Sequence, residues 1–189
     1  MDTSLFEMIN NLAGKVPWLD VVMILSAKYL PVLFAVVLVI FYLTFQADQQ
    51  RVAVLASIST LIALGIAQSI AFLDPRPRPY LTHVAHLLIA RSNDPSFPSD
   101  HATFSFAIAT MVWLYSRKVG GILICLAALV GFSRVYVGTH YPMDVVGGAA
   151  LGIAVSLITN QIFKQTKIRA LLDRVFIALH EWRLAGKPE

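Results

Sequence analysis

Residues 52–73, VAVLASISTLIALGIAQSIAFL, contain no charged side chain over 22 consecutive positions. An α-helix of about 20 mostly apolar residues is long enough to cross the roughly 30 Å hydrocarbon layer of a bilayer. The stretch is continuously apolar rather than alternating, so it predicts a membrane-spanning helix and argues against a strand of a membrane β-barrel. Two further uncharged stretches, 29–47 and 145–163, have the same character.

The composition of the whole chain agrees with a membrane protein. Of its 189 residues, 57% are hydrophobic and only 14% are charged, far from the balance of a soluble domain. The length suits a single domain, 1–189. Two shorter apolar blocks, 101–116 and 119–133, predict a tight helical hairpin. We therefore expect an all-α, polytopic membrane bundle of about five to six transmembrane helices, with crossings at roughly 19–46, 51–74, 99–116, 119–136 and 143–163.

Short interfacial helices are expected at both ends of this membrane region. In residues 3–14, one helical face carries the apolar side chains Leu5, Met8, Ile9 and Leu12. Residues 167–183 repeat the pattern with basic residues on the other faces, and we expect the polar side of both helices to be solvated. Lys28 and Pro31 interrupt the first crossing and leave open whether it is one kinked helix or is broken into two near Lys28.

Basic residues are distributed unevenly between the two sides of the membrane. Five crossings place the turns near 46–51 and 116–120 on the same side as the C-terminal tail. That side carries Arg51, Arg117, Lys118, Lys164, Lys167, Arg169, Arg174, Arg183 and Lys187. By the positive-inside rule it faces the cytoplasm, so the loops 75–98 and 134–143 face outward. The sequence pI of about 9.4 reflects this asymmetry, and no nucleic-acid partner is expected.

Four helix ends meet on the outer side and bring polar residues together. They supply Arg76, Arg78, Ser99, Asp100, His101, Ser133, Arg134, His140 and Asp144. Arginines at membrane depth are costly unless they have a partner, and the planar guanidinium matches the geometry of phosphate. The helix that starts near Ser99 also offers free N–H groups and a favourable dipole. The cluster therefore predicts a site for an anion, and phosphate fits it best.

Ser99, Asp100 and His101 are the three residue types of a hydrolase triad, but they are consecutive. Neighbours at a helix start point about 100° apart, so they can hardly form a relay among themselves. His140 and Asp144 are four residues apart and share one face of a helical turn. A carboxylate that accepts Nδ1–H would leave Nε2 as nucleophile or base, and His101 becomes the acid for a leaving group. The two histidines indicate an enzyme that transfers a phosphoryl group through a phosphohistidine intermediate.

On these residues the chain resembles the type 2 phosphatidic acid phosphatase (PAP2) superfamily. The pattern of that family has a Lys, six residues and Arg-Pro, then Pro-Ser-Gly-His, then Ser-Arg, five residues, His, three residues and Asp. The third piece is complete here, from Ser133 to Asp144, and the second reads PSDH with Asp100 in place of Gly. The first is present as Arg78 and the proline after it, whereas Ala71 occupies the position of the Lys.

The PSDH variant, the lost Lys and the short chain narrow the resemblance to bacterial undecaprenyl-diphosphate phosphatases of the bacitracin-resistance type. This resemblance implies a polyprenyl diphosphate lipid as the partner within the membrane bilayer, cut to undecaprenyl phosphate and phosphate on the extracytoplasmic face of the bacterial cytoplasmic (inner) membrane. It also implies no cofactor and no metal. By position, His140 is the nucleophile, Asp144 orients it and His101 is the acid. The phosphate oxygens are held by Arg78, Arg134, Ser99 and the backbone N–H groups of Asp100 and His101.

Several alternatives remain open from the sequence. Arg76 either replaces the missing Lys as a phosphate ligand or pairs with Asp74. Asp100 is a neighbour of the helix cap, shapes the surroundings of His101 or contacts the substrate. A phosphatase of the same fold for phosphatidic acid or phosphatidylglycerophosphate is an alternative function, and a non-catalytic lipid-binding or transport protein is one of another class. The oligomeric state is not predicted.

Overall fold

A computed structural model describes residues 1–44 and 46–165 of the chain, and the predicted helix at 167–183 lies outside them. In the described residues the chain is helical and has no strand. The helices are α1 (Asp2–Asn10), α2 (Pro17–Leu43), α3 (Ala47–Leu73), α4 (Pro79–Thr82), α5 (Asp100–Tyr115), α6 (Arg117–Tyr136) and α7 (Pro142–Gln165). The five predicted crossings thus correspond to α2, α3, α5, α6 and α7, with boundaries that differ by a few residues.

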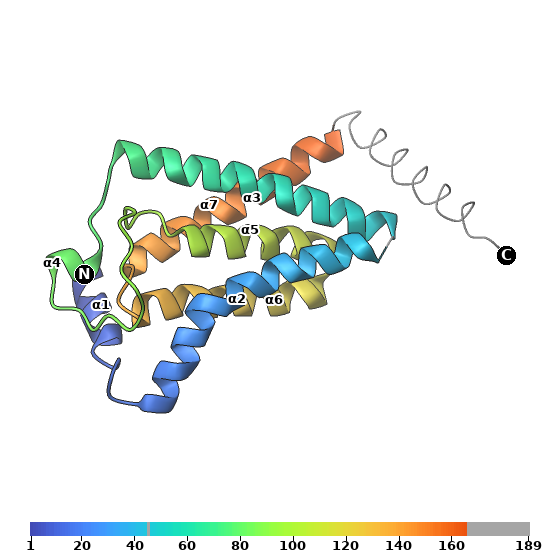
Figure 1. The fold of residues 1–189 in the computed structure, drawn as a ribbon. Coiled ribbons are helices and arrows are strands. Elements are labelled where there is room, and N and C mark those ends of the chain that lie inside the picture. The colour runs from blue at the N-terminus through green and yellow to red at the C-terminus, as the bar shows by residue number, and fades with distance from the viewer. Residues whose placement is uncertain (45, 166–189) are drawn as a thin grey trace.

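The long helices form a bundle around α5, which packs against α3, α6 and α7 (Figure 1). α2, α3, α6 and α7 are each long and apolar enough to cross a membrane. α5 has 16 residues, which at 1.5 Å per residue gives roughly 24 Å, less than the thickness of the hydrocarbon layer. Its central residues Ala107, Ile108 and Ala109 are fully buried. The chain is therefore a multi-pass membrane protein with a short, enclosed central helix.

Small residues on α7 allow it to approach α5 closely. A Cβ atom added at Gly148 would lie 2.5 Å from the carbonyl oxygen of Ser99, and one at Gly152 would lie 2.5 Å from that of Thr103. Both distances are too short for a side chain, so the glycines are required at this contact. Glycines four residues apart are a common means of close helix packing in membranes, and here they bring the start of α7 against the start of α5.

α2 is one continuous helix although Pro31 lies inside it. Figure 1 shows that α2 changes direction along its length. A proline in a helix interior removes one backbone hydrogen bond and clashes with the preceding turn, which is the usual cause of such a bend. Of the two arrangements that the sequence left open, the structure has the single helix.

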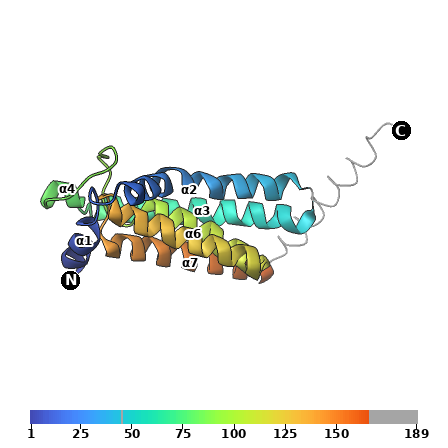
Figure 2. The same cartoon turned by 90° about the horizontal axis from the view of Figure 1, so that it is seen from below.

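α1 packs against the end of the bundle at which α6 ends and α7 begins (Figures 1 and 2). Phe6 and Asn10 are buried on its inner face, while Leu5 and Met8 from the predicted apolar stripe remain exposed. The Asn10 side chain donates to the backbone carbonyls of His86 and Tyr136, at 2.9 and 2.8 Å, and accepts from the His86 N–H at 2.8 Å. α1 is therefore anchored to the protein by polar contacts, with an apolar face left free.

Candidate active site

The predicted site residues gather at the end of the bundle that carries α1, α4 and the loop between α3 and α5 (Figures 1 and 2). Local features of the sequence explain why the site residues lie at this end of the bundle. The proline-rich segment after α3 ends that helix, and the Ser99 N–H donates to the Asp144 carbonyl at 3.0 Å, which ties the start of α5 to that of α7. Gly138 adopts φ +86°, a conformation that suits glycine, and the turn it makes after α6 leads directly to His140.

His140 is buried and its two ring nitrogens have different partners. Nδ1 lies 2.8 Å from the backbone carbonyl oxygen of Ser96, and Nε2 lies 3.3 Å from Nη1 of Arg78. Because a carbonyl oxygen can only accept, Nδ1 carries the proton and donates it. Nε2 then presents its lone pair toward Arg78. The ring is therefore held in the tautomer that a nitrogen nucleophile requires.

Asp144 does not make the direct hydrogen bond to His140 that its spacing predicts. The nearest separation, from Oδ2 to Nδ1 of His140, is 3.8 Å. Instead Oδ1 accepts from Nη1 of Arg76 at 2.6 Å, and Oδ2 accepts from Oγ of Ser96 at 2.5 Å and from the Tyr141 N–H at 2.8 Å. Ser96 thus stands between them, since its hydroxyl donates to Asp144 and its carbonyl accepts from His140. The sequence does not indicate this role of Ser96, because any residue type supplies a backbone carbonyl.

The surroundings of His140 favour its neutral form. Burial lowers its pKa to about 4, the positive charges of Arg134 and Arg78 act in the same direction, and Asp144 opposes them. A histidine has an ordinary pKa near 6.5. The Nε2 lone pair is accordingly available at neutral pH.

Three residues predicted to bind phosphate are buried next to this imidazole or at the adjoining helix start. Arg78 donates through Nε to the Asp94 carbonyl at 2.8 Å and through Nη1 to the Thr139 carbonyl at 3.4 Å, besides its contact with His140. In the residues that the structure describes, Nε of Arg134 and Oγ of Ser99 are buried without a hydrogen-bond partner. An unsatisfied buried polar group costs about 1–3 kcal/mol, so these donors indicate a site that is completed by an oxygen-rich anion.

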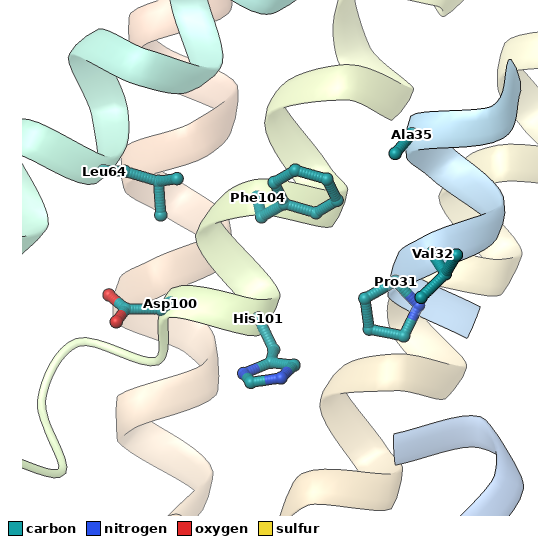
Figure 3. A pocket seen from close by; sticks show the side chains of 7 residues that line it. All are labelled: Pro31, Val32, Ala35, Leu64, Asp100, His101 and Phe104. Atoms are coloured by element: carbon teal, nitrogen blue, oxygen red, sulfur yellow. The ribbon is translucent and has the colours of Figure 1, made fainter. Parts of the chain in front are cut away.

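Asp100 and His101 lie in the first turn of α5 and border a pocket of about 390 Å³ (Figure 3). The Asp100 carboxylate accepts from Nε2 of Gln68 on α3 at 2.7 Å. In Figure 3 the His101 ring faces the gap between α5 and α2. The remaining wall of this open pocket is apolar and consists of Pro31, Val32, Ala35, Leu64 and Phe104. The pocket is therefore polar at one end, where Asp100 and His101 lie, and apolar elsewhere.

Arg76 lies between two carboxylates. Besides Nη1 on Asp144, its Nη2 lies 2.7 Å from Oδ2 of Asp2, and its guanidinium stacks 4.2 Å from the ring centre of Tyr141. Arg76 thus pairs with Asp2 and Asp144 rather than with Asp74, the partner considered from the sequence. In the residues that the structure describes, no three His, Cys, Asp or Glu side chains are arranged to hold a metal ion.

Comparison with known proteins places this geometry in a family. Residues 53–168 match the model of the PAP2 superfamily. The chain belongs to that superfamily. The undecaprenyl-diphosphatase BcrC of Bacillus subtilis is 33% identical over 158 residues, which cover 84% of this chain and 82% of that protein. The crystal structure of Aquifex aeolicus LpxE superimposes with a TM-score of 0.73 at 30% identity, covering 84% of this chain and 94% of the other. That of a transmembrane PAP2-type phosphatidylglycerolphosphate phosphatase from Bacillus subtilis does so with a TM-score of 0.58 at 26% identity, covering 87% of each chain.

Proposed function

We propose that this protein is a membrane phosphatase that hydrolyses undecaprenyl diphosphate to undecaprenyl phosphate and inorganic phosphate. The observation that carries the proposal is the neutral His140, whose Nε2 lone pair faces Arg78. The unpartnered Arg134 Nε and Ser99 Oγ support it, because they supply donors for the oxygens of a phosphoryl group. The similarity to BcrC supports the choice of a polyprenyl diphosphate.

In the first chemical step, Nε2 of His140 attacks the terminal phosphorus. An N–P bond forms while the bond from phosphorus to the bridging oxygen breaks, and the electron pair leaves with that oxygen. His101 donates a proton to it, which releases undecaprenyl phosphate. Arg78, Arg134, Ser99 and the first amides of α5, those of Asp100 and His101, stabilise the charge on the three equatorial oxygens.

In the second step, water hydrolyses the phosphohistidine. The neutral His101 accepts a proton from the water, an O–P bond forms, and the N–P bond breaks. Inorganic phosphate leaves, His140 regains its lone pair, and His101 is again protonated for the next cycle. Asp144 acts on this cycle through Ser96, whose carbonyl holds the Nδ1–H of His140.

The pocket beside His101 supports a lipid as the substrate. It is open, its wall is apolar except at Asp100 and His101, and it lies between α2, α3 and α5 (Figure 3). A prenyl chain bound against Val32, Leu64 and Phe104 keeps its diphosphate at the start of α5. Apolar pockets with few polar groups at one end are typical of sites that orient an amphiphilic ligand.

The protein is expected in the bacterial cytoplasmic membrane with this site on the extracytoplasmic face. The basis is the number of basic residues that the sequence carries at the opposite end of the bundle and in the C-terminal tail, among them Arg51 near the start of α3 and Arg117 at the start of α6. In that orientation the enzyme recycles the lipid carrier of peptidoglycan synthesis, and its abundance raises resistance to bacitracin. A cysteine placed in the loop 83–95 should then react with a membrane-impermeant maleimide in intact cells.

A phosphatidylglycerophosphate phosphatase is the second candidate, and the structural similarity to the Bacillus enzyme of that name favours it. The two candidates, together with a non-catalytic lipid-binding role, are separated by phosphate release from the purified protein. The substrates are undecaprenyl diphosphate, phosphatidylglycerophosphate and phosphatidic acid, each in mixed micelles without added metal. We expect the highest kcat/KM on undecaprenyl diphosphate. A preference for a glycerolipid would change the substrate assignment, and no release from any of them would remove the enzymatic function.

A further inference from the structure

Arg76 is held more firmly by the protein than a substrate ligand would be. Its two terminal nitrogens form salt bridges of 2.6 Å to Asp144 and 2.7 Å to Asp2, and its flat face covers Tyr141. Asp144 is fully buried and Asp2 is largely so. Each terminal nitrogen thus donates to a different carboxylate, which fixes the orientation of the guanidinium plane between them.

Asp2 brings the N-terminal helix into the same arrangement. Its Oδ2 binds Arg76, and its Oδ1 accepts from the N–H of Met143 in the first turn of α7 at 3.0 Å. A carboxylate at a helix N-terminus is favourably placed with respect to the helix dipole. The buried Phe6 and the Asn10 hydrogen bonds hold α1 in this place. Asp2 therefore connects α1, α7 and the loop after α3.

From Asp144 the contacts continue to the reacting imidazole. Arg76 occupies Oδ1, which leaves Oδ2 for Ser96 and the Tyr141 amide. The Ser96 carbonyl, in turn, receives Nδ1–H of His140. Without Arg76, Oδ1 of the buried Asp144 would lose its partner, and only the Ser96 and Tyr141 hydrogen bonds on Oδ2 would hold the carboxylate in place.

We propose that Arg76 and Asp2 are positioning residues: they hold Asp144, and through Ser96 the nucleophile His140, and they do not bind the phosphate. This inference rests on the proposed phosphatase function. It makes α1 a part of the catalytic scaffold and replaces the interpretation of Arg76 as a substitute for the missing Lys. Outer partners that orient a metal-bound histidine are typically worth about 10–100-fold in activity, and we expect an effect of that size for groups that act on His140 through Asp144 and Ser96.

The test compares Arg76→Gln and Asp2→Asn with matched controls that remove the same charges elsewhere on this face. Arg91→Gln and Asp74→Asn serve, since both residues are exposed. We expect Arg76→Gln to lower kcat about 10–100-fold and Asp2→Asn about threefold to tenfold. KM and the inhibition constant of inorganic phosphate should stay within about twofold of wild type, because the phosphate ligands are intact. Arg78→Gln, in contrast, should weaken inhibition by phosphate.

A double-mutant cycle separates positioning from a general loss of structure. If Asp2 acts through Arg76, Asp2→Asn should have little further effect in the Arg76→Gln protein. Arg76→Lys should recover part of kcat, since it restores a charge beside Asp144. A raised phosphate inhibition constant in Arg76→Gln, or additive losses in the cycle, overturns the inference. Wild type without phosphatase activity would instead contradict the proposed function itself.

Discussion

The two histidines of the site stand in different surroundings. His140 is buried, with Ser96 on one ring nitrogen and Arg78 on the other, whereas His101 lies on the wall of an open, mostly apolar pocket (Figure 3). The protein orients the first imidazole before any substrate is present. In the part of the chain that the structure describes, no hydrogen bond holds the second ring, and we expect it to meet its partner when the lipid arrives. The difference matches the proposed division of labour between nucleophile and acid.

Removal of the nucleophile should have the largest effect. We expect His140→Ala to lower kcat by at least about 10⁴-fold, because both steps depend on the N–P bond. The same substitution at His86, an exposed histidine of the loop between α4 and α5, should leave activity near that of wild type. The measurement is phosphate release, together with acid-labile ³²P incorporated into the protein during turnover. Incorporation that persists in His140→Ala would move the nucleophile elsewhere.

Loss of His101 should be smaller and should depend on the leaving group. For undecaprenyl diphosphate we expect His101→Ala to lower kcat by about 10²–10⁴-fold, the usual contribution of a general acid. For p-nitrophenyl phosphate, whose leaving group needs no proton, the loss in the first step should nearly vanish. Pre-steady-state release of p-nitrophenol measures that step. An equal loss with both substrates would assign His101 to binding rather than to proton transfer.

The pH dependence should report how strongly its surroundings control His140. Burial lowers the pKa of His140 to about 4. Only the neutral imidazole can attack, and it is the main form at any pH above that value. The rate of p-nitrophenol release should therefore be nearly constant from pH 7 down to about 5 and fall as the pH approaches 4. A histidine of ordinary pKa near 6.5 would already have lost about tenfold at pH 5.5. The use of His101→Ala removes the titration of the acid from the profile.

The sequence revealed the helices and the polar cluster but not the contacts within the cluster. Long uncharged stretches require membrane-spanning helices whatever the partners are, so α3 lies close to its predicted range. The prediction of a direct Asp144–His140 hydrogen bond was wrong because α7 begins only at Pro142, so His140 lies before the helix and its spacing from Asp144 is not that of a helical turn. Ser96 binds His140 through its backbone carbonyl, and Asp2 binds Arg76 although the two are 74 positions apart in the sequence. Both depend on how the loop folds back.

The pocket likewise depends on the relative placement of α2, α3 and α5, which hydropathy does not determine. In the sequence, the hydropathy of its apolar residues does not distinguish them from residues that simply face the lipid. What distinguishes Ala35 from its neighbour Val36 is that Ala35 lines the pocket and Val36 does not. This pair offers a controlled test of the open side of the site.

The smallest expected effect comes from narrowing that pocket. Ala35→Phe adds a ring to the wall opposite Phe104 and should raise KM for undecaprenyl diphosphate by about threefold to tenfold, as the loss of one buried apolar contact implies. For p-nitrophenyl phosphate, which has no prenyl chain, kcat/KM should not change. Val36→Phe adds the same ring to an exposed position of the same helix and controls for altered insertion into the membrane. If both variants affect the two substrates alike, the prenyl chain does not occupy the pocket beside His101. The open surroundings of His101 would then not serve to bind the lipid, and the contrast with the buried His140 would have another cause.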